Sequence, residues 1–362
     1  MLYAQLTHSI GLNDVCDSLS IHSGPLSALR GARAPARNTL SHAGRKRPAL
    51  LAERLFWEML AHLQGLAPDF SRCGMGRGVA RRFRRTIHLV DSTVIELVAN
   101  SMDWASHRRR KAAAKCHMRL DLHSLLPRFA IVDTARHSDA KRAREICAGI
   151  RAGEIVVFDR AYVDFDHLFE LFLRGAFWVT RTKTSLRLRV VRRRKVPAGS
   201  KILADEEVVL SRKDAYAEKY PERMRRVRAL VVVDGREREM EFLTNNMEWA
   251  ASSVADLYRC RWEIEVFFKQ IKQTLNLADF LGHNANAVRW QIWTALLVFL
   301  LLRFLAHLSR WGHSFTRLFA IVRAALWERI DLDLLLKCYG TAGGCFRAMA
   351  TPEQAYFPAF QR

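Results

Sequence analysis

Two aspartates stand at equivalent places in this chain, each at the end of an apolar run that is typical of a buried strand. Asp91 follows residues 87–90, and Asp159 follows residues 155–158. If the two strands are neighbours in one sheet, the carboxylates meet and repel each other unless a cation lies between them. Carboxylate oxygens are hard ligands that suit Mg²⁺ or Mn²⁺. The pattern therefore indicates a metal site, and an aspartate that only caps a turn is the competing interpretation.

A third acid, Glu265, lies in a segment whose spacing predicts an amphipathic helix. Tyr258, Arg261, Glu265 and Lys272 stand at offsets 0, 3, 7 and 14, which at about 100° per residue places them in one stripe of the helix surface. The adjoining apolar stripe consists of Ile264, Phe268, Ile271 and Leu275. The helix can thus bury one face and present an acid beside cations and a phenol. The alternative is a solvated face on which Arg261 and Glu265 form an ordinary i,i+4 ion pair.

The string Tyr258-x-x-Arg261-x-x-x-Glu265-x-x-x-x-x-x-Lys272 resembles the signature of bacterial DDE transposases of the insertion-sequence-four family. The order of strand acid, strand acid, β-rich insertion and helix acid is also similar to the order in that family. The resemblance covers residues 85–310 and extends more weakly to the N-terminal segment.

Two shorter motifs carry the same resemblance. Asp91-Ser92-Thr93 is similar to the family's first-aspartate motif, and Asp159-Arg160-Ala161-Tyr162 is similar to its second. The family usually has glycine where this chain has Ala161. This departure changes the freedom of the backbone after the acid and leaves the carboxylate untouched.

The resemblance implies an α/β fold with a ribonuclease-H-like core, in which helices flank a mixed sheet and a β-rich insertion precedes the last catalytic helix. It implies that Asp91, Asp159 and Glu265 are catalytic and hold two Mg²⁺ or Mn²⁺ ions for phosphoryl transfer. The implied activity is cut-and-paste transposition of an insertion sequence. A strand is nicked, the new 3′-hydroxyl forms a hairpin, the hairpin is reopened, and the free end joins target DNA.

The resemblance also implies which side chains contact DNA. Tyr258, Arg261, Lys272 and Arg160 are expected at phosphates, which suit Arg and Lys in particular. Trp262 is placed to stack on an unpaired base in the hairpin step, and a core tryptophan is the competing interpretation. The expected partners are double-stranded DNA, namely terminal inverted repeats and target DNA, and a second copy of the chain in a synaptic homodimer.

The composition agrees with a nucleic-acid partner. Lys and Arg number 58 against 36 Asp and Glu, a formal net charge of +22, and such an excess favours a polyanion as the binding partner.

Seven scattered cysteines without a C-x-x-C pair argue against a zinc site and a disulfide framework. The start has no signal-peptide pattern, and the apolar run at residues 295–306 is shorter than the ~20 residues of a membrane span. We therefore expect a buried core helix, no membrane, and a cytoplasmic protein at the bacterial nucleoid.

The acids need a sheet and helices to position them. The patterns predict strands at 87–91, 116–123, 128–134, 155–159 and 176–180, and helices at 137–149, 164–174 and 247–336. Asp234-Gly235 predicts a tight hairpin turn within the insertion.

Five segments are expected along the 362 residues. They are a helical N-terminal DNA-binding domain at 1–75, the first part of the core at 76–182, the insertion at 183–244, the second part with the Glu-bearing helix at 245–310, and a helical C-terminal region at 311–362. The first segment suits a helix-turn-helix style of binding, or is a helical cap on the core. Residues 1–6 resemble the middle of a helix and have no capping residue ahead of them, so we expect that some N-terminal residues are missing.

Two other functions compete with a transposase. The first is a nuclease that shares the core and lacks strand joining, and the second is a non-mobile DNA-binding relative. The three acids weigh against the second, and the β-rich insertion favours a transposase over the first.

Overall fold

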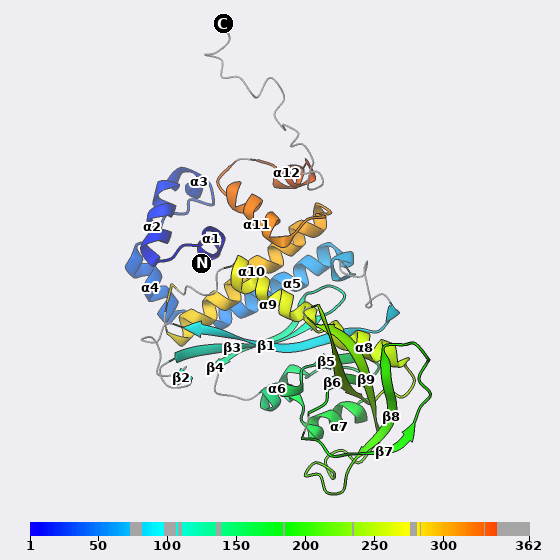
Figure 1. Cartoon of the computed structure of the whole chain (residues 1–362). Coiled ribbons are helices and arrows are strands. Elements are labelled where there is room, and N and C mark those ends of the chain that lie inside the picture. The colour runs from blue at the N-terminus through cyan, green and yellow to red at the C-terminus, as the bar shows by residue number, and fades with distance from the viewer. Residues whose placement is uncertain are drawn as a thin grey trace. The chain divides into compact units, whose positions relative to one another are not determined.

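The computed structural model of the chain describes residues 1–72, 82–97, 106–107, 111–134, 139–183, 185–233, 235–275, 281–282, 284–328 and 330–338. They belong to two compact units (Figure 1), one of residues 1–70 and 270–362 and the other of residues 71–269. Beyond Cys338, the expected helical C-terminal region lies outside the described residues.

A mixed sheet is the centre of the unit of residues 71–269. Its ten described strands are β1 (Ile87–Leu97), β2 (Ser106–His107), β3 (Lys111–Asp121), β4 (Pro127–Thr134), β5 (Ile155–Phe158), β6 (Phe177–Arg181), β7 (Leu188–Arg193), β8 (Ile202–Leu210), β9 (Met224–Val233) and β10 (Arg236–Thr244). The order is β2-β3-β1-β5-β6-β10-β9-β8-β7, and β4 pairs with β3. Strand β1 is antiparallel to β3 and parallel to β5, which is in turn parallel to β6.

Helices cover both faces of this sheet (Figure 1). On one face, α6 (Asp139–Ile146) and α7 (Phe165–Leu173) share a hydrophobic core with Val90 and Phe158. Helix α8 (Ala251–Arg259) packs on β6, β9 and β10. All four residues of β5 are buried, as its continuous apolar sequence predicted. A mixed sheet flanked by helices confirms the predicted ribonuclease-H-like α/β class.

Strand β1 differs from its prediction, because it does not end at Asp91 but continues to Leu97. The parallel pairing with β5 ends at Val90 and Phe158. The antiparallel pairing with β3 continues as far as Leu97 and Ala112. Asp91 therefore lies in mid-strand, at the point where β1 loses one of its two neighbours.

The strands of the predicted insertion continue the same sheet, because β10 pairs with β6. Strands β9 and β10 form the expected hairpin, in which Gly235 has a φ of +73° that favours glycine.

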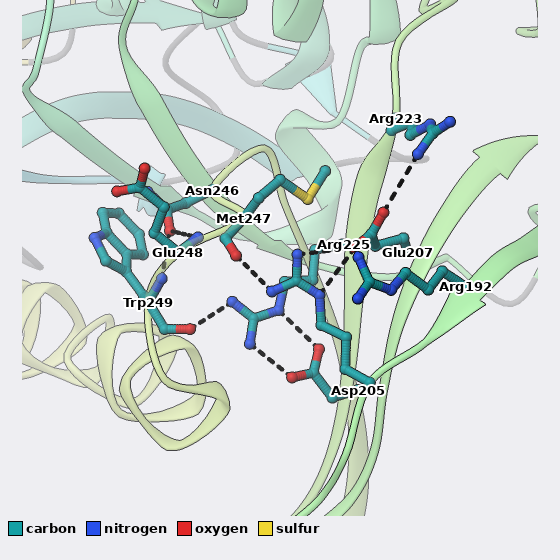
Figure 2. A network of polar contacts seen from close by, with 10 residues as sticks. Arg192, Asp205, Glu207, Arg223, Arg225, Asn246, Met247, Glu248 and Trp249 are labelled. Carbon is teal, nitrogen blue, oxygen red and sulfur yellow. Dashed lines mark hydrogen bonds and ion pairs between the residues drawn. The ribbon is translucent and has the colours of Figure 1, made fainter.

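Figure 2 shows how the insertion holds the segment that leads into α8. Arg225 of β9 donates two hydrogen bonds of 2.7 Å to the Asp205 carboxylate and one of 2.5 Å to the carbonyl of Trp249. Arg194 similarly joins Glu207 to the carbonyl of Met247. Because these guanidinium groups bridge carboxylate and main chain, they fix the start of the helix that carries Tyr258.

The other unit is helical in its described residues. It contains α1 (Leu2–Thr7), α2 (Leu12–Ile21), α3 (Ser23–Ser27), α4 (Arg37–Lys46), α5 (Leu50–Leu66), α10 (Ala285–Leu308), α11 (Phe315–Ala324) and α12 (Leu332–Cys338). Helix α10 is longer than the apolar run that the sequence showed, and by length and composition it could cross a membrane. Residues 291–300 are nevertheless all buried, and α10 packs against α1, α4, α5 and α11. It is the buried core helix that we predicted.

Candidate active site

The sheet brings the two strand-associated aspartates together. Val90 of β1 and Phe158 of β5 are paired in neighbouring parallel strands. Asp91 directly follows Val90, and Asp159 directly follows Phe158. Val90 and Phe158 point into the core beneath α6 and α7. Because side chains alternate along a strand, Asp91 points to the opposite face, where α8 ends.

Arg261 connects the third acid to this pair. Its Nη1 donates to Asp91 Oδ2 at 2.9 Å, and its Nη2 donates to Glu265 Oε1 at 2.5 Å. The i,i+4 pair that the sequence offered as an alternative is thus present, but the same guanidinium also contacts Asp91 of β1. Arg261 is 17% exposed and Asp91 is 16% exposed, so little solvent screens this contact.

Tyr258 holds the remaining acid. Its hydroxyl donates to Asp159 Oδ1 at 3.3 Å, and its ring lies 5.6 Å from the Arg261 guanidinium carbon. Burial raises the pKa of Tyr258 to about 12, so the hydroxyl stays protonated and remains a donor at neutral pH. The sequence indicated Tyr258 as a DNA contact and did not reveal that it orients an acid.

The predicted single helix is wrong, because the chain forms two helices with a turn between them. Helix α8 ends at Arg259, and α9 (Trp262–Thr274) begins after Arg261. The junction is tightened by i to i−3 hydrogen bonds, from Arg261 N to Tyr258 O at 3.0 Å and from Ile264 N to Arg261 O at 3.2 Å. Arg261 therefore sits in the turn, between the helix that carries Tyr258 and the helix that carries Glu265. The predicted apolar stripe is buried at Ile264, Phe268 and Ile271 of α9 and at Leu275 just after it.

The other predicted DNA-contacting residues are Trp262, Arg160 and Lys272. Trp262 begins α9 and is 58% exposed, so the interpretation as a core tryptophan is wrong. Arg160 is exposed in the short 3-10 turn that follows Asp159. Lys272 lies on α9, in the part of that helix that belongs to the helical unit.

Burial raises the pKa of Asp91 to about 6. Arg261 and the Ser92 amide lower it, while Asp159 and Glu265 raise it further. A carboxylate in this environment is stabilised by any further cation that approaches it.

The donor set fits a hard divalent cation, because it consists of three carboxylates and no sulfur ligand. Within the described ranges, however, no three His, Cys, Asp or Glu side chains are arranged to hold a metal ion. The Arg261 guanidinium contacts both Asp91 and Glu265. Its single positive charge offsets part of the negative charge of the two acids.

Sequence reasoning missed a second polar cluster beneath the acids. Ser92 and Tyr162 stand inside the two aspartate motifs, but their partners Asp139, His117 and Lys115 come from other elements. No spacing in the sequence connects these partners to the acids.

The chain is similar to a transposase family model and to proteins that are named as transposases. A family model described as "Transposase DDE domain" matches residues 82–301. A protein named "Putative transposase y4zB" from Sinorhizobium fredii is 31% identical over 327 residues, 89% of this chain and 86% of that protein. The "Probable transposase for insertion sequence element IS5377" of Geobacillus stearothermophilus is 28% identical over 66% of this chain and 62% of its own length. A solved structure of the piggyBac transposase synaptic complex with hairpin DNA aligns with a TM-score of 0.46 and 11% identity over 90% of this chain and 68% of that one.

Proposed function

The chain belongs to the family of DDE transposases, and from this premise we propose that Asp91, Asp159 and Glu265 are its catalytic acids and that it moves an insertion sequence by a cut-and-paste route. The observation that carries the proposal is the contact of Arg261 with both Asp91 and Glu265, beside the pairing of β1 with β5. Together with the hydrogen bond from Tyr258 to Asp159, these contacts join the two aspartate motifs to the motif that contains Glu265.

Each residue of the cluster has a separate task in this proposal. The three acids would hold divalent metal, as two Mg²⁺ or Mn²⁺ ions, which when bound activate a water or 3′-hydroxyl and stabilise the leaving oxygen. The Tyr258 hydroxyl keeps Asp159 oriented. Arg261 offsets part of the negative charge of the acids before DNA arrives and then contacts a phosphate, with Arg160 and Lys272 as further phosphate contacts. Trp262 offers its exposed ring to a base that leaves the stack.

Double-stranded DNA is the proposed partner, as terminal inverted repeats and as target. The net charge of +22 supports a broad DNA-contacting surface. Residues 1–75 are proposed as a DNA-binding domain, since α4 carries Arg37, Arg45 and Lys46 and has no buried residue. We also propose a homodimer in the synaptic complex and action in the cytoplasm at the bacterial nucleoid.

The direct test is incubation of the protein with the ends of its own element and Mg²⁺, followed by denaturing gels. A transposase of the proposed kind yields a nick, then a hairpin, then joined product. Nicks without hairpin or joining would instead indicate a nuclease of the same fold. Retention of the DNA without any cleavage would indicate a DNA-binding relative and would reject the proposed chemistry.

Arg261→Gln is expected to bind Mn²⁺ more tightly than the wild type when no DNA is present. The guanidinium competes with the ion for Asp91 and Glu265, and a unit charge at this range contributes about 1–4 kcal/mol, so the affinity gain is about fivefold or more. The measurement is a titration of free Mn²⁺ by electron paramagnetic resonance.

The matched control for this titration is Arg259→Gln. Arg259 also lies beside the turn, but it is exposed and pairs with Asp256, not with the acids. The control should titrate like the wild type. Equal Mn²⁺ affinities for Arg261→Gln and the wild type would show that the guanidinium and the ion do not compete.

A further inference from the structure

A polar cluster lies on the face of the sheet opposite the acids, with His117 and Tyr162 buried and Ser92, Lys115 and Asp139 half-buried. The Ser92 hydroxyl donates to Asp139 Oδ1 at 3.0 Å, and Lys115 Nζ lies 2.6 Å from the same oxygen. His117 Nδ1 lies 3.4 Å from that oxygen and 2.9 Å from the Tyr162 hydroxyl. The Asp139 carboxylate of α6 and the His117 imidazole of β3 therefore connect Ser92 of β1, Lys115 of β3 and Tyr162 of the turn after β5.

The cluster holds the two segments that carry the aspartates. Ser92 follows Asp91, and the Ser92 amide donates to Asp91 Oδ1 at 2.7 Å. Tyr162 closes the turn that begins at Asp159, through a hydrogen bond from its amide to the Asp159 carbonyl at 3.0 Å. His117 lies directly across from Ser92 in the pairing of β3 with β1. A movement of Asp91 relative to Asp159 would therefore break contacts in this cluster.

The surroundings of the cluster keep these contacts in one arrangement. His117 is fully buried and Tyr162 is 1% exposed. Burial lowers the pKa of His117 to about 4, and burial raises the pKa of Tyr162, so both side chains are neutral at neutral pH. Hydrogen bonds to buried groups such as His117 and Tyr162 are costly to break.

We propose that Asp139 and His117 are positioning residues, which set the separation of Asp91 and Asp159 by holding Ser92 and Tyr162 from the opposite face of the sheet. This inference rests on the proposed catalytic role of the two aspartates. Neither positioning residue contacts the acids directly, so both act through the backbone of β1 and of the turn after β5.

Two conservative variants of the full-length protein test the proposal. Tyr162→Phe removes one hydroxyl from the cluster, and Asp139→Asn removes the charge that pairs with Lys115. The matched controls lie on the same side of the sheet. Tyr220→Phe removes a hydroxyl from the same hydrophobic core, and Asp164→Asn alters the cap of α7.

Two quantities are measured for each variant, namely Mn²⁺ affinity by electron paramagnetic resonance and the Mg²⁺ concentration that gives half-maximal cleavage of the element ends. Loss of a group that orients metal ligands typically changes metal affinity by about 10–100-fold. Tyr162→Phe and Asp139→Asn should therefore lower the Mn²⁺ affinity, and raise the half-maximal Mg²⁺ concentration, by at least about tenfold. DNA affinity should not change, and saturating Mn²⁺ should restore cleavage. Tyr220→Phe and Asp164→Asn should keep the wild-type metal dependence.

The outcomes separate this inference from the proposed function. If Asp91→Asn is inactive but Tyr162→Phe and Asp139→Asn keep the wild-type metal dependence, the positioning role is rejected and the catalytic role stands. If Asp91→Asn cleaves normally, the catalytic role itself is rejected. A uniform loss of stability, DNA binding and cleavage with no change in metal affinity would assign the cluster a structural role only, and would also overturn the inference.

Discussion

Asp91→Asn, Asp159→Asn and Glu265→Gln should each abolish cleavage of the element ends while binding of those ends survives. The amide keeps the shape of each side chain and can still accept a hydrogen bond from Tyr258 or Arg261, but it removes the negative charge that would hold metal. Metal ions contribute several kcal/mol to such reactions, and about 1.4 kcal/mol corresponds to a tenfold change in rate, so the expected loss is about 10³-fold or more.

The measurement is a denaturing gel for nicks in Mg²⁺, beside a binding assay with the same DNA. Asp256→Asn is the matched control, because Asp256 lies on α8 and pairs with Arg82 and Arg259 rather than with the cluster. Its cleavage should equal that of the wild type. Any one of the three acid variants that cleaves at the wild-type rate would remove its residue from the proposed triad.

Trp262→Ala should leave the first nick nearly intact and slow the formation of the hairpin. A hairpin bends the DNA sharply, so at least one base must leave the stack, whereas nicking needs no bent DNA. Stacking on an aromatic ring is worth about 1–3 kcal/mol per base, which corresponds to about a fivefold to hundredfold slower hairpin step. Since Trp262 is 58% exposed, its truncation leaves no core cavity. Nicked DNA should therefore accumulate on the gel.

Two controls distinguish stacking from a loss of structure. Trp262→Phe retains an aromatic ring and should recover most of the hairpin rate. An abasic site at the extruded position should partly rescue Trp262→Ala, because the unstacking is then already complete. Hairpin formation by Trp262→Ala at the wild-type rate, on DNA with all its bases, would exclude the stacking role.

Much of the fold could be predicted from the sequence because its signals are local. A continuous apolar run such as residues 155–158 predicts a strand buried on both faces wherever the rest of the chain goes. The stripe that includes Ile264 and Phe268 likewise predicts which face of α9 is buried. The resemblance in the three motifs then indicated which three acids should lie close together in the structure. The strand and helix inferences each used residues within about one element of each other.

Only the tertiary structure decided how the acids are held. Arg261 contacts Asp91 across 170 positions of the chain, Tyr258 contacts Asp159 across 99, and His117 contacts Tyr162 across 45. Such contacts depend on which strands become neighbours, and no periodic pattern records that choice. The continuation of β1 past Asp91 has the same origin, because it depends on how far β3 remains beside it. The sequence by itself thus determined which residue types are available for the chemistry, and the pairing of the strands determined which of them meet.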